Sequence, residues 1–286
     1  MTHELYMLSQ SVMVQFLELL PYWASGLIVG SLISVYCSER IAAKMTHLNS
    51  GKVGILSIGI ASILGILSPI CMYGTIPVIA ALGRKKVPQQ LLVAFMVSSV
   101  LLNPNLFLLS FALGVEIALS RLLLVFMCGS LAGVLVLIFL QYKTLFDFAR
   151  FVSESKEKKT FLRDLFKAFR VTTPYLLFGI ILTALLYRYM PQEWIASMFG
   201  ARRGLGVLFA TSLSIPLYAC GGGIIPLIRA WLLAGMGTGD ALAFMIAGPA
   251  TKITNLSAVK MILGAKHFFF YLAYCMIFAI VAGLIM

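Results

Sequence analysis

Ser68-Pro69-Ile70-Cys71-Met72-Tyr73-Gly74-Thr75-Ile76-Pro77 is the stretch that decides the fold, because its pattern returns between Ser214 and Pro226. At an offset of 149 residues, nine of the positions between 71 and 97 carry the same amino acid in both copies. A repeat of this extent indicates an internal duplication of the chain. The matched positions include three pairs: Cys71 with Cys220, Gly74 with Gly223, and Pro77 with Pro226.

The duplication extends toward the start of each half. At an offset of 153, residues 21–36 align with residues 174–189, and both begin with Pro-Tyr. Between the halves lies a charged stretch, residues 142–170, with eight Lys or Arg and four Asp or Glu. We therefore expect a first transmembrane repeat at 1–141, a basic cytoplasmic linker at 142–170, and a second transmembrane repeat at 171–286.

The composition is that of a membrane protein. Of 286 residues, 61% are hydrophobic and 11% are charged, and the mean hydropathy is +1.00. Soluble domains carry about 25% charged residues, so the chain is expected to be an all-α integral membrane protein of the cell inner membrane that crosses it several times. The net charge of +12 lies mostly in loops, which favours contact with anionic lipid over nucleic acid.

Each half contains about four hydrophobic segments, so about eight are expected in total. The first half has a helix at 21–36, an arm at 53–67 that leads to the Cys-Pro-Gly break, an interrupted segment at 90–113, and a segment at 122–140. The second half repeats this order, with arms at 205–217 and 224–234, an interrupted segment at 241–263 and a final helix at 268–285.

Two topologies compete. If both cysteine segments cross the bilayer, the halves are parallel and several basic loop residues face the outside. If both are re-entrant hairpins, the halves are inverted repeats and those basic residues lie inside, as the positive-inside rule requires. The arm at 53–67, about 22 Å long at 1.5 Å per residue, is long for half a membrane. We favour the inverted arrangement.

The two broken segments carry the leading candidates for a binding site. Cys71 and Cys220 occupy matched positions, and thiolates are soft ligands for Cu(I), Zn(II) and trivalent metalloids. The alternative is that both thiols are buried as small apolar groups. The accompanying Gly74, Pro77, Gly223 and Pro226 predict kinked or unwound backbone, which in a bilayer is expected to line a cavity.

The interrupted segments supply polar candidates. Asn103 and Asn105 interrupt the first, and Thr251, Lys252 and Asn255 interrupt the second. They are candidates for contacts with a solute, or for interhelical hydrogen bonds. Lys252 stands out as an ionisable group in an apolar run, with a role as a charge partner for the solute or snorkelling to the interface as the alternatives.

Motifs of nucleotide-driven or enzymatic chemistry are absent from the sequence. There is no Walker A sequence, no Cys-x-x-Cys pair and no nucleophile with an acid–base partner at a recognisable spacing. We therefore expect no cofactor, no enzymatic activity and no ATP hydrolysis by this chain.

The Pro-x-Cys-x-x-Gly-x-x-Pro segment at 69–77, its partner at 220–226, and Ala247-Gly248-Pro249-Ala250-Thr251 resemble the predicted-permease family of YraQ/ArsP type. The resemblance spans both halves. It implies a polytopic permease, in a family where some members export trivalent organoarsenicals and others are linked to divalent metal efflux. Met72-Tyr73 after Cys71, and Lys252, depart from the pattern expected for the family, which bears on the substrate more than on the fold.

The resulting hypothesis is a permease that exports a thiophilic metal or metalloid species, such as a trivalent organoarsenical, by ATP-independent alternating access. Cys71 and Cys220 are the metal or metalloid ligands in this hypothesis. The alternative is a permease for a small organic or sulfur-containing solute, with structural cysteines. A third hypothesis is an intramembrane enzyme or a membrane scaffold that binds a partner through residues 142–170. The sequence leaves the oligomeric state open, a homo-oligomer included.

Overall fold

The computed structural model describes four continuous parts of the chain, residues 54–68, 87–139, 203–218 and 224–286. Every regular element in these parts is a helix. It also describes isolated positions elsewhere: 10, 12–14, 16, 17, 20, 21, 24, 28, 75, 78, 79, 82, 83, 162, 165, 166, 169, 170, 173, 177 and 181. The prediction of a helical protein is confirmed for the described parts.

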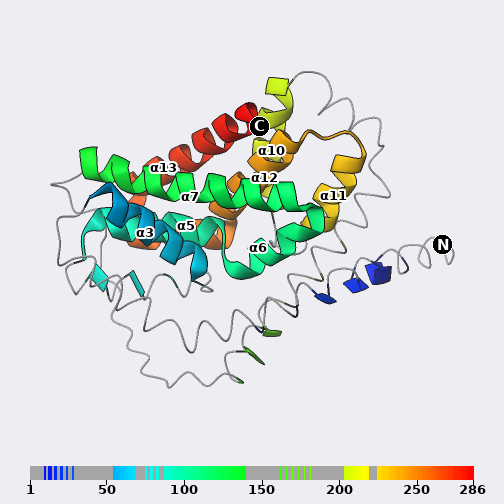
Figure 1. Ribbon diagram of the computed structural model, residues 1–286, viewed down its shortest axis with the longest axis horizontal. Helices are drawn as coiled ribbons and strands as arrows, with labels where there is room; N and C mark the ends of the chain where they lie inside the picture. Colours follow the sequence, from blue (N-terminus) through cyan, green and yellow to red (C-terminus); the bar gives the residue numbers. More distant parts are fainter. Residues whose placement is uncertain are drawn as a thin grey trace.

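The described helices of the two halves follow a similar order, except that α11 has no counterpart among the described elements of the first half (Figure 1). The described elements of the first half are α3 (Ile55–Leu67), α5 (Gln89–Leu101), α6 (Pro104–Ser110), the 3-10 turn η1 (Phe111–Leu113) and α7 (Val115–Phe139). Those of the second half are α10 (Arg203–Leu217), α11 (Ile225–Leu233), α12 (Thr238–Thr251) and α13 (Ile253–Ile285).

The correspondence between the halves includes their irregular points. α5 and α12 each end at a break, which is followed at once by further helix from Pro104 and from Ile253. A glycine with positive φ then precedes the long apolar helix in each half: Gly114 (φ 121°) and Gly264 (φ 69°), which interrupts α13. Positive φ is accessible to glycine without a steric penalty, so both halves turn the chain at the same place by the same means.

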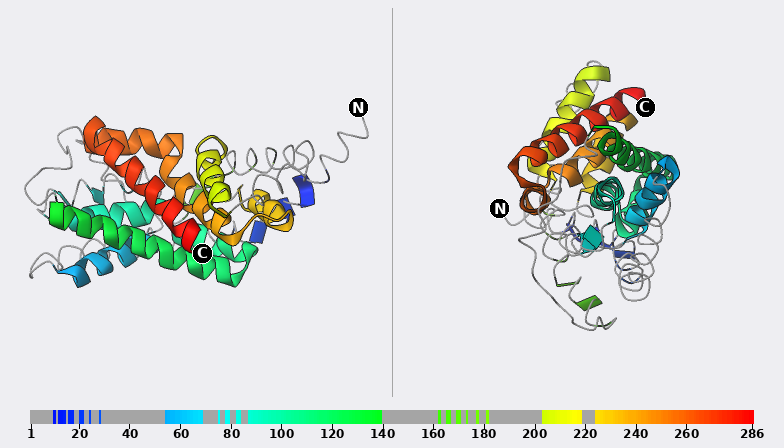
Figure 2. Two further views of the ribbon diagram at one scale, coloured as in Figure 1. Left: turned by 90° about the horizontal axis from the view of Figure 1, so that it is seen from above. Right: turned by 90° about the vertical axis from the view of Figure 1, so that its left-hand side faces the viewer.

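The helices pack as two groups of three. In the first half α3, α5 and α7 lie against one another, and in the second α10, α12 and α13 do so. The end-on view in Figure 2 shows the two groups side by side. α12 also packs against α5 and α7, and α13 packs against α7, so the two groups are in contact with each other through these helices. The core of buried side chains is continuous across both.

A glycine of the long apolar helix allows close packing in each group. A Cβ on Gly133 of α7 would lie 2.5 Å from Ile58 Cγ2 and 3.0 Å from Ala94 Cβ. A Cβ on Gly283 of α13 would lie 2.9 Å from Val207 Cγ1 and 2.8 Å from Ala243 Cβ. Small residues that let backbones approach closely are typical of helix interfaces in membranes. In each group of three helices, a glycine of the long apolar helix therefore lets the other two helices pack closely against it.

Within the described parts of the chain, two helices are long and apolar enough to cross a bilayer: α7, with 25 residues, and the part of α13 from His267 to Ile285, with 19. At 1.5 Å per residue these measure about 37 and 28 Å, against a hydrocarbon core of about 30 Å. A third span results if Gln89–Leu101 and Pro104–Leu113, bent by 41° at their break, cross as one segment. These findings indicate a helical membrane protein.

The breaks have local causes. Asn103 caps α6, because its side-chain oxygen accepts a hydrogen bond from the backbone N–H of Leu106 at 2.8 Å. Pro104 then occupies the first turn of α6, where its missing N–H costs nothing. The predicted interruptions of the segments 90–113 and 241–263 are confirmed, the second at Lys252.

Other predictions fall outside what is described. The first helix of each half (21–36 and 174–189) and the linker at 142–170 are described only at isolated positions. The division into two repeats and a linker therefore stays a prediction.

Candidate functional site at the junction of the two halves

Five of the predicted site residues, Cys71, Gly74, Pro77, Cys220 and Gly223, lie outside the described residues. Pro226, the remaining site residue predicted in the broken segments, lies in the first turn of α11 and is half-buried. A proline at this position starts a helix without removing a hydrogen bond. In the second half, regular helix therefore resumes directly after the broken segment.

The residues that flank both cysteine segments are buried. Ser68 precedes Cys71 in the sequence and Thr75 follows it, and both are 0% exposed. Thr75 Oγ1 lies 3.4 Å from Ser99 Oγ of α5, which ties the first segment to that helix. In the second half Tyr218 precedes Cys220 in the sequence and Ile224 follows it, and both are 5% exposed. The chain thus enters and leaves both cysteine segments inside the protein.

The polar residues of the first break differ in their surroundings. The side-chain oxygen of Asn103 serves as the α6 cap, a structural role. Asn105, two residues later, has a buried Oδ1 atom with no hydrogen-bond partner among the described residues. A buried amide oxygen in this state costs free energy and is available to a ligand.

Two polar residues of the second break donate hydrogen bonds to backbone carbonyls of α12. Thr251 Oγ1 donates to the carbonyl of Ala247 at 2.9 Å, within its own helix. Asn255 Nδ2 donates across the break to the carbonyl of Pro249 at 2.7 Å. Lys252 lies between α12 and α13 and is half-buried. The break is therefore stabilised by side chains that the sequence marked as site candidates.

Pro249 frees a carbonyl inside α12. In an α-helix the N–H of residue 249 would donate to the carbonyl of Met245, but proline has no N–H. Arg121 of α7 supplies the missing donor, because its Nη2 donates to the Met245 carbonyl at 3.3 Å. A cation of the first half is thereby bound to a helix of the second half that contains a proline.

Arg121 is the centre of a buried polar cluster. The side chain is 1% exposed, and its Nη1 donates to Ser110 Oγ at the end of α6 at 2.8 Å. The Tyr218 side chain, at the end of α10, interacts with the guanidinium electrostatically. We call Arg121, Ser110, Tyr218 and the Met245 carbonyl the Arg121 cluster. It unites four elements from both halves, α6, α7, α10 and α12.

Gly248 makes room for one member of this cluster. A Cβ on Gly248 would lie 2.5 Å from Cγ of the Tyr218 ring and closer still to Cδ2. The ring therefore lies directly on the α12 backbone, beside Phe244, with the two ring centroids 6.4 Å apart. Gly248 and Pro249 of the Gly-Pro-Ala-Thr motif thus both shape the cluster, since the glycine admits Tyr218 and the proline leaves a carbonyl for Arg121.

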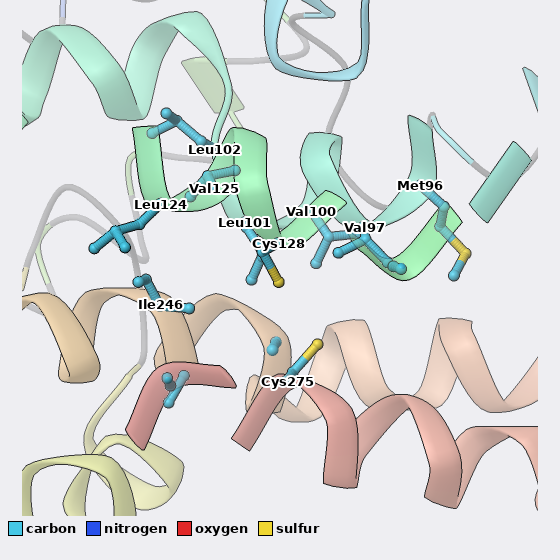
Figure 3. Packing of buried hydrophobic residues seen from close by; sticks show 14 of the residues in the cluster. Met96, Val97, Val100, Leu101, Leu102, Leu124, Val125, Cys128, Ile246 and Cys275 are labelled. Carbon is cyan, nitrogen blue, oxygen red and sulfur yellow. The ribbon is translucent and has the colours of Figure 1, made fainter. Parts of the chain in front are cut away.

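A second pair of thiols lies at the same junction. Figure 3 shows Cys128 of α7 and Cys275 of α13 facing each other between the two groups of helices. Both are free and 0% exposed, and their side chains interact directly. The Tyr274 hydroxyl donates to the backbone carbonyl of Cys128 at 2.5 Å. Among the described residues, no three potential metal ligands of the His, Cys, Asp or Glu types lie together.

Sequence reasoning missed the Arg121 cluster and the Cys128–Cys275 pair. One signal was available: Arg121 lies one residue before the apolar segment predicted at 122–140, and α7 includes it. Ionisable residues at such positions are functional candidates by default. Cys128 and Cys275 occupy no matched positions in the two repeats, so only the packing of α7 against α13 reveals that they meet.

The chain resembles known proteins over nearly its whole length. Residues 3–286 match the ArsP_1 family, described as a predicted permease. A Streptococcus mutans protein, named as a subunit of a two-component membrane permease complex, is 24% identical over 255 residues, or 85% of this chain and 83% of that protein. No solved structure gives a significant match.

Two UPF0718 proteins match over shorter stretches. One, from Methanocaldococcus jannaschii, is 26% identical over 132 residues, which is 46% of this chain and 36% of that protein. YcgR of Bacillus subtilis is 36% identical over 76 residues, which is 27% of this chain and 26% of that protein. Family membership points to a transporter rather than an enzyme. With a family match over residues 3–286 and apolar helices of bilayer length, the chain belongs to the ArsP_1 family of predicted membrane permeases.

Proposed function

We propose that this permease exports a thiophilic metal or metalloid species, such as a trivalent organoarsenical, across the cell inner membrane. The observation that carries the proposal is the burial of the residues on both sides of Cys71 and of Cys220. Non-helical backbone inside a membrane protein is tolerated where protein buries it or where it lines a cavity. Transport proceeds without ATP hydrolysis by this chain, by alternating access at the junction of the two halves.

The proposed topology is a pair of inverted repeats with about four hydrophobic segments each. α3 and α10, the arms before the cysteine segments, have 13 and 15 residues. At 1.5 Å per residue they measure about 20 and 22 Å, short of the ~30 Å hydrocarbon core. Arms of this length fall short of a full crossing but exceed half of one, so the proposal of a hairpin that enters and leaves on one side rests on the positions of the basic loops. Paired broken segments in two inverted halves form the substrate site of many secondary transporters.

The proposed ligands are the Cys71 and Cys220 thiolates. Soft thiolate and thioether groups select soft metal ions. Met96 of α5 and Met245 of α12, which occupy matched positions, are 1% and 0% exposed and place further sulfur in the core of each half. The Asn105 amide and the Lys252 ammonium are the proposed polar contacts for the cargo at the two breaks, while Asn103, Thr251 and Asn255 shape the backbone around them.

Transport into inside-out membrane vesicles tests the proposal. Vesicles with the wild-type protein should accumulate at least one of four cargoes: a trivalent methylarsenical, arsenite, Cu(I) or Zn(II). The variant Cys71→Ser/Cys220→Ser should lose this uptake, because serine is a poor ligand for soft ions. The matched control is Cys128→Ser/Cys275→Ser, which also removes two thiols but leaves the broken segments intact. Uptake of none of the cargoes by the wild type would reject a metal or metalloid cargo.

A second candidate is a permease for a small organic or sulfur-containing solute, in which Cys71 and Cys220 only pack. The buried cation Arg121 favours this candidate when the solute is anionic. Full transport by Cys71→Ser/Cys220→Ser would support it.

The name of the Streptococcus mutans relative, a subunit of a two-component complex, suggests a second subunit for this permease as well. The proposed binding segment for such a subunit is the linker at 142–170. A pull-down from solubilised membranes, with and without that linker replaced by a neutral one of equal length, tests for it.

A further inference from the structure

Arg121 carries a buried charge with no carboxylate beside it in the described parts of the chain. Only two acidic residues are described. Glu116 is exposed at the start of α7, and Asp240 accepts a hydrogen bond from the Gly237 N–H at the start of α12. Tyr218, which interacts with the guanidinium, is not an acidic residue. Buried cations in membrane helices are costly and normally face a counter-charge or a pathway.

The neutral contacts of Arg121 do not explain why the position carries a charge. A guanidinium has five N–H donors, and two of its nitrogens bond Ser110 Oγ and the Met245 carbonyl. Its Nε has no partner among the described residues, although it is buried. A neutral glutamine would suffice to bond the carbonyl that Pro249 leaves free.

The arrangement leaves the Nε–H of the guanidinium without an acceptor among the described residues. The contacts to Ser110 and Met245 fix the guanidinium between α6 and α12. The edge that contains Nε is the side on which arginine makes two parallel bonds to a carboxylate or an oxyanion.

We propose that Arg121 binds an anionic group, a carboxylate or a small oxyanion, that enters the junction of the two halves as part of the transported solute or together with it. Nε and one terminal nitrogen donate to two oxygens of the anion. This role rests on the proposed function in one respect, because it requires a transport path that reaches the junction. It does not depend on whether Cys71 and Cys220 bind metal.

Thermal unfolding of the purified full-length protein in detergent provides the test. Sodium acetate and sodium propionate represent carboxylates, and sodium sulfate and sodium phosphate represent free oxyanions, all compared with sodium chloride at equal ionic strength. The variants are Arg121→Gln, which removes the charge, and Arg121→Lys, which keeps the charge but cannot make two parallel hydrogen bonds to one anion. Arg229→Gln, at an exposed arginine of α11, is the matched control.

In the wild type and in Arg229→Gln, at least one carboxylate or oxyanion should raise the unfolding temperature in a saturable manner, beyond the effect of chloride. Arg121→Gln should raise the concentration for half of this effect about 10- to 100-fold, and Arg121→Lys by less, because a charge-assisted fork is lost or weakened. A response to acetate or propionate assigns the anion to an organic solute, and one limited to sulfate or phosphate assigns it to a free oxyanion.

Two outcomes would overturn the inference: no response of the wild type to any of the four salts beyond chloride, or an equal response of Arg121→Gln. If Arg121→Gln does not fold, Arg121→Lys decides, since an unchanged half-effect concentration there contradicts recognition by the fork. Cys71→Ser/Cys220→Ser should keep the anion response. A failure of the metal or metalloid proposal can therefore be told apart from a failure of the anion-binding inference.

Discussion

At the scale of single residues, two glycines set the distance between helices. Gly133 and Gly283 each face an aliphatic side chain and an alanine of the neighbouring helices. A Cβ added at either glycine would lie closer to these atoms than van der Waals contact allows. Overpacking a tight site of this kind costs about 1–3 kcal/mol of folding free energy. We therefore expect Gly133→Ala and Gly283→Ala each to lower the stability of the protein, measured by thermal unfolding in detergent.

Gly204 supplies the control for this prediction. It lies in α10, and the nearest atom to a Cβ there, Leu284 Cδ2, is 3.9 Å away. Gly204→Ala should be neutral or stabilising by up to about 1 kcal/mol, because alanine is the better helix former. If Gly283→Ala proves as stable as Gly204→Ala, α10, α12 and α13 pack less closely than the structure indicates.

At the scale of elements, α12 depends on a proline whose lost hydrogen bond is replaced from another helix. Pro249→Ala should restore the N–H donor to the Met245 carbonyl and stabilise α12 by about 1–3 kcal/mol. Arg121 then competes for that carbonyl, so transport should fall even though stability rises. The measurements are unfolding temperature and vesicle uptake of whichever cargo the wild type accepts.

A double-mutant cycle tests the link between the two helices. Arg121→Met, which removes every donor, Pro249→Ala and the double variant should show a coupling energy of about 0.5–1.5 kcal/mol, the size of one hydrogen bond. Additive effects on stability would mean that Arg121 gains nothing from the carbonyl that Pro249 frees.

At the scale of the whole molecule, the contact between α7 and α13 joins the two halves. A variant that retains only Cys128 and Cys275, with a protease site inserted in the linker at 142–170, should keep its halves together after cleavage if iodine first oxidises the thiol pair. The reason is that the two thiols interact directly across the junction. Non-reducing gel electrophoresis measures the result.

Loss of either thiol provides the control. With Cys275→Ser in the same background, cleavage should release two fragments whether or not iodine is added. Separate fragments from the two-thiol variant after oxidation would place α7 and α13 further apart than Figure 3 shows.

Much of the architecture was predictable because it repeats. The duplication anticipated the helix, break and helix order of both halves, and the breaks at Asn103 and Lys252 lie within the predicted interrupted segments. Prolines, asparagines and glycines act on the local backbone, so their effect can be predicted from the sequence alone. The candidate site was less predictable. Cys71 and Cys220 remain predicted ligands, and Arg121 was not among the candidates.

The sequence by itself determined the class of protein, the duplication and the positions of the broken helices, since hydropathy and backbone restrictions are properties of short segments. Only the tertiary structure decided which side chains share the junction. Arg121 meets the Met245 carbonyl across 124 residues, and Cys128 meets Cys275 across a still longer separation. Such contacts depend on how α7 packs against α12 and α13. That packing rests on the fit of glycines, rings and hydroxyls between helices, which no local pattern encodes.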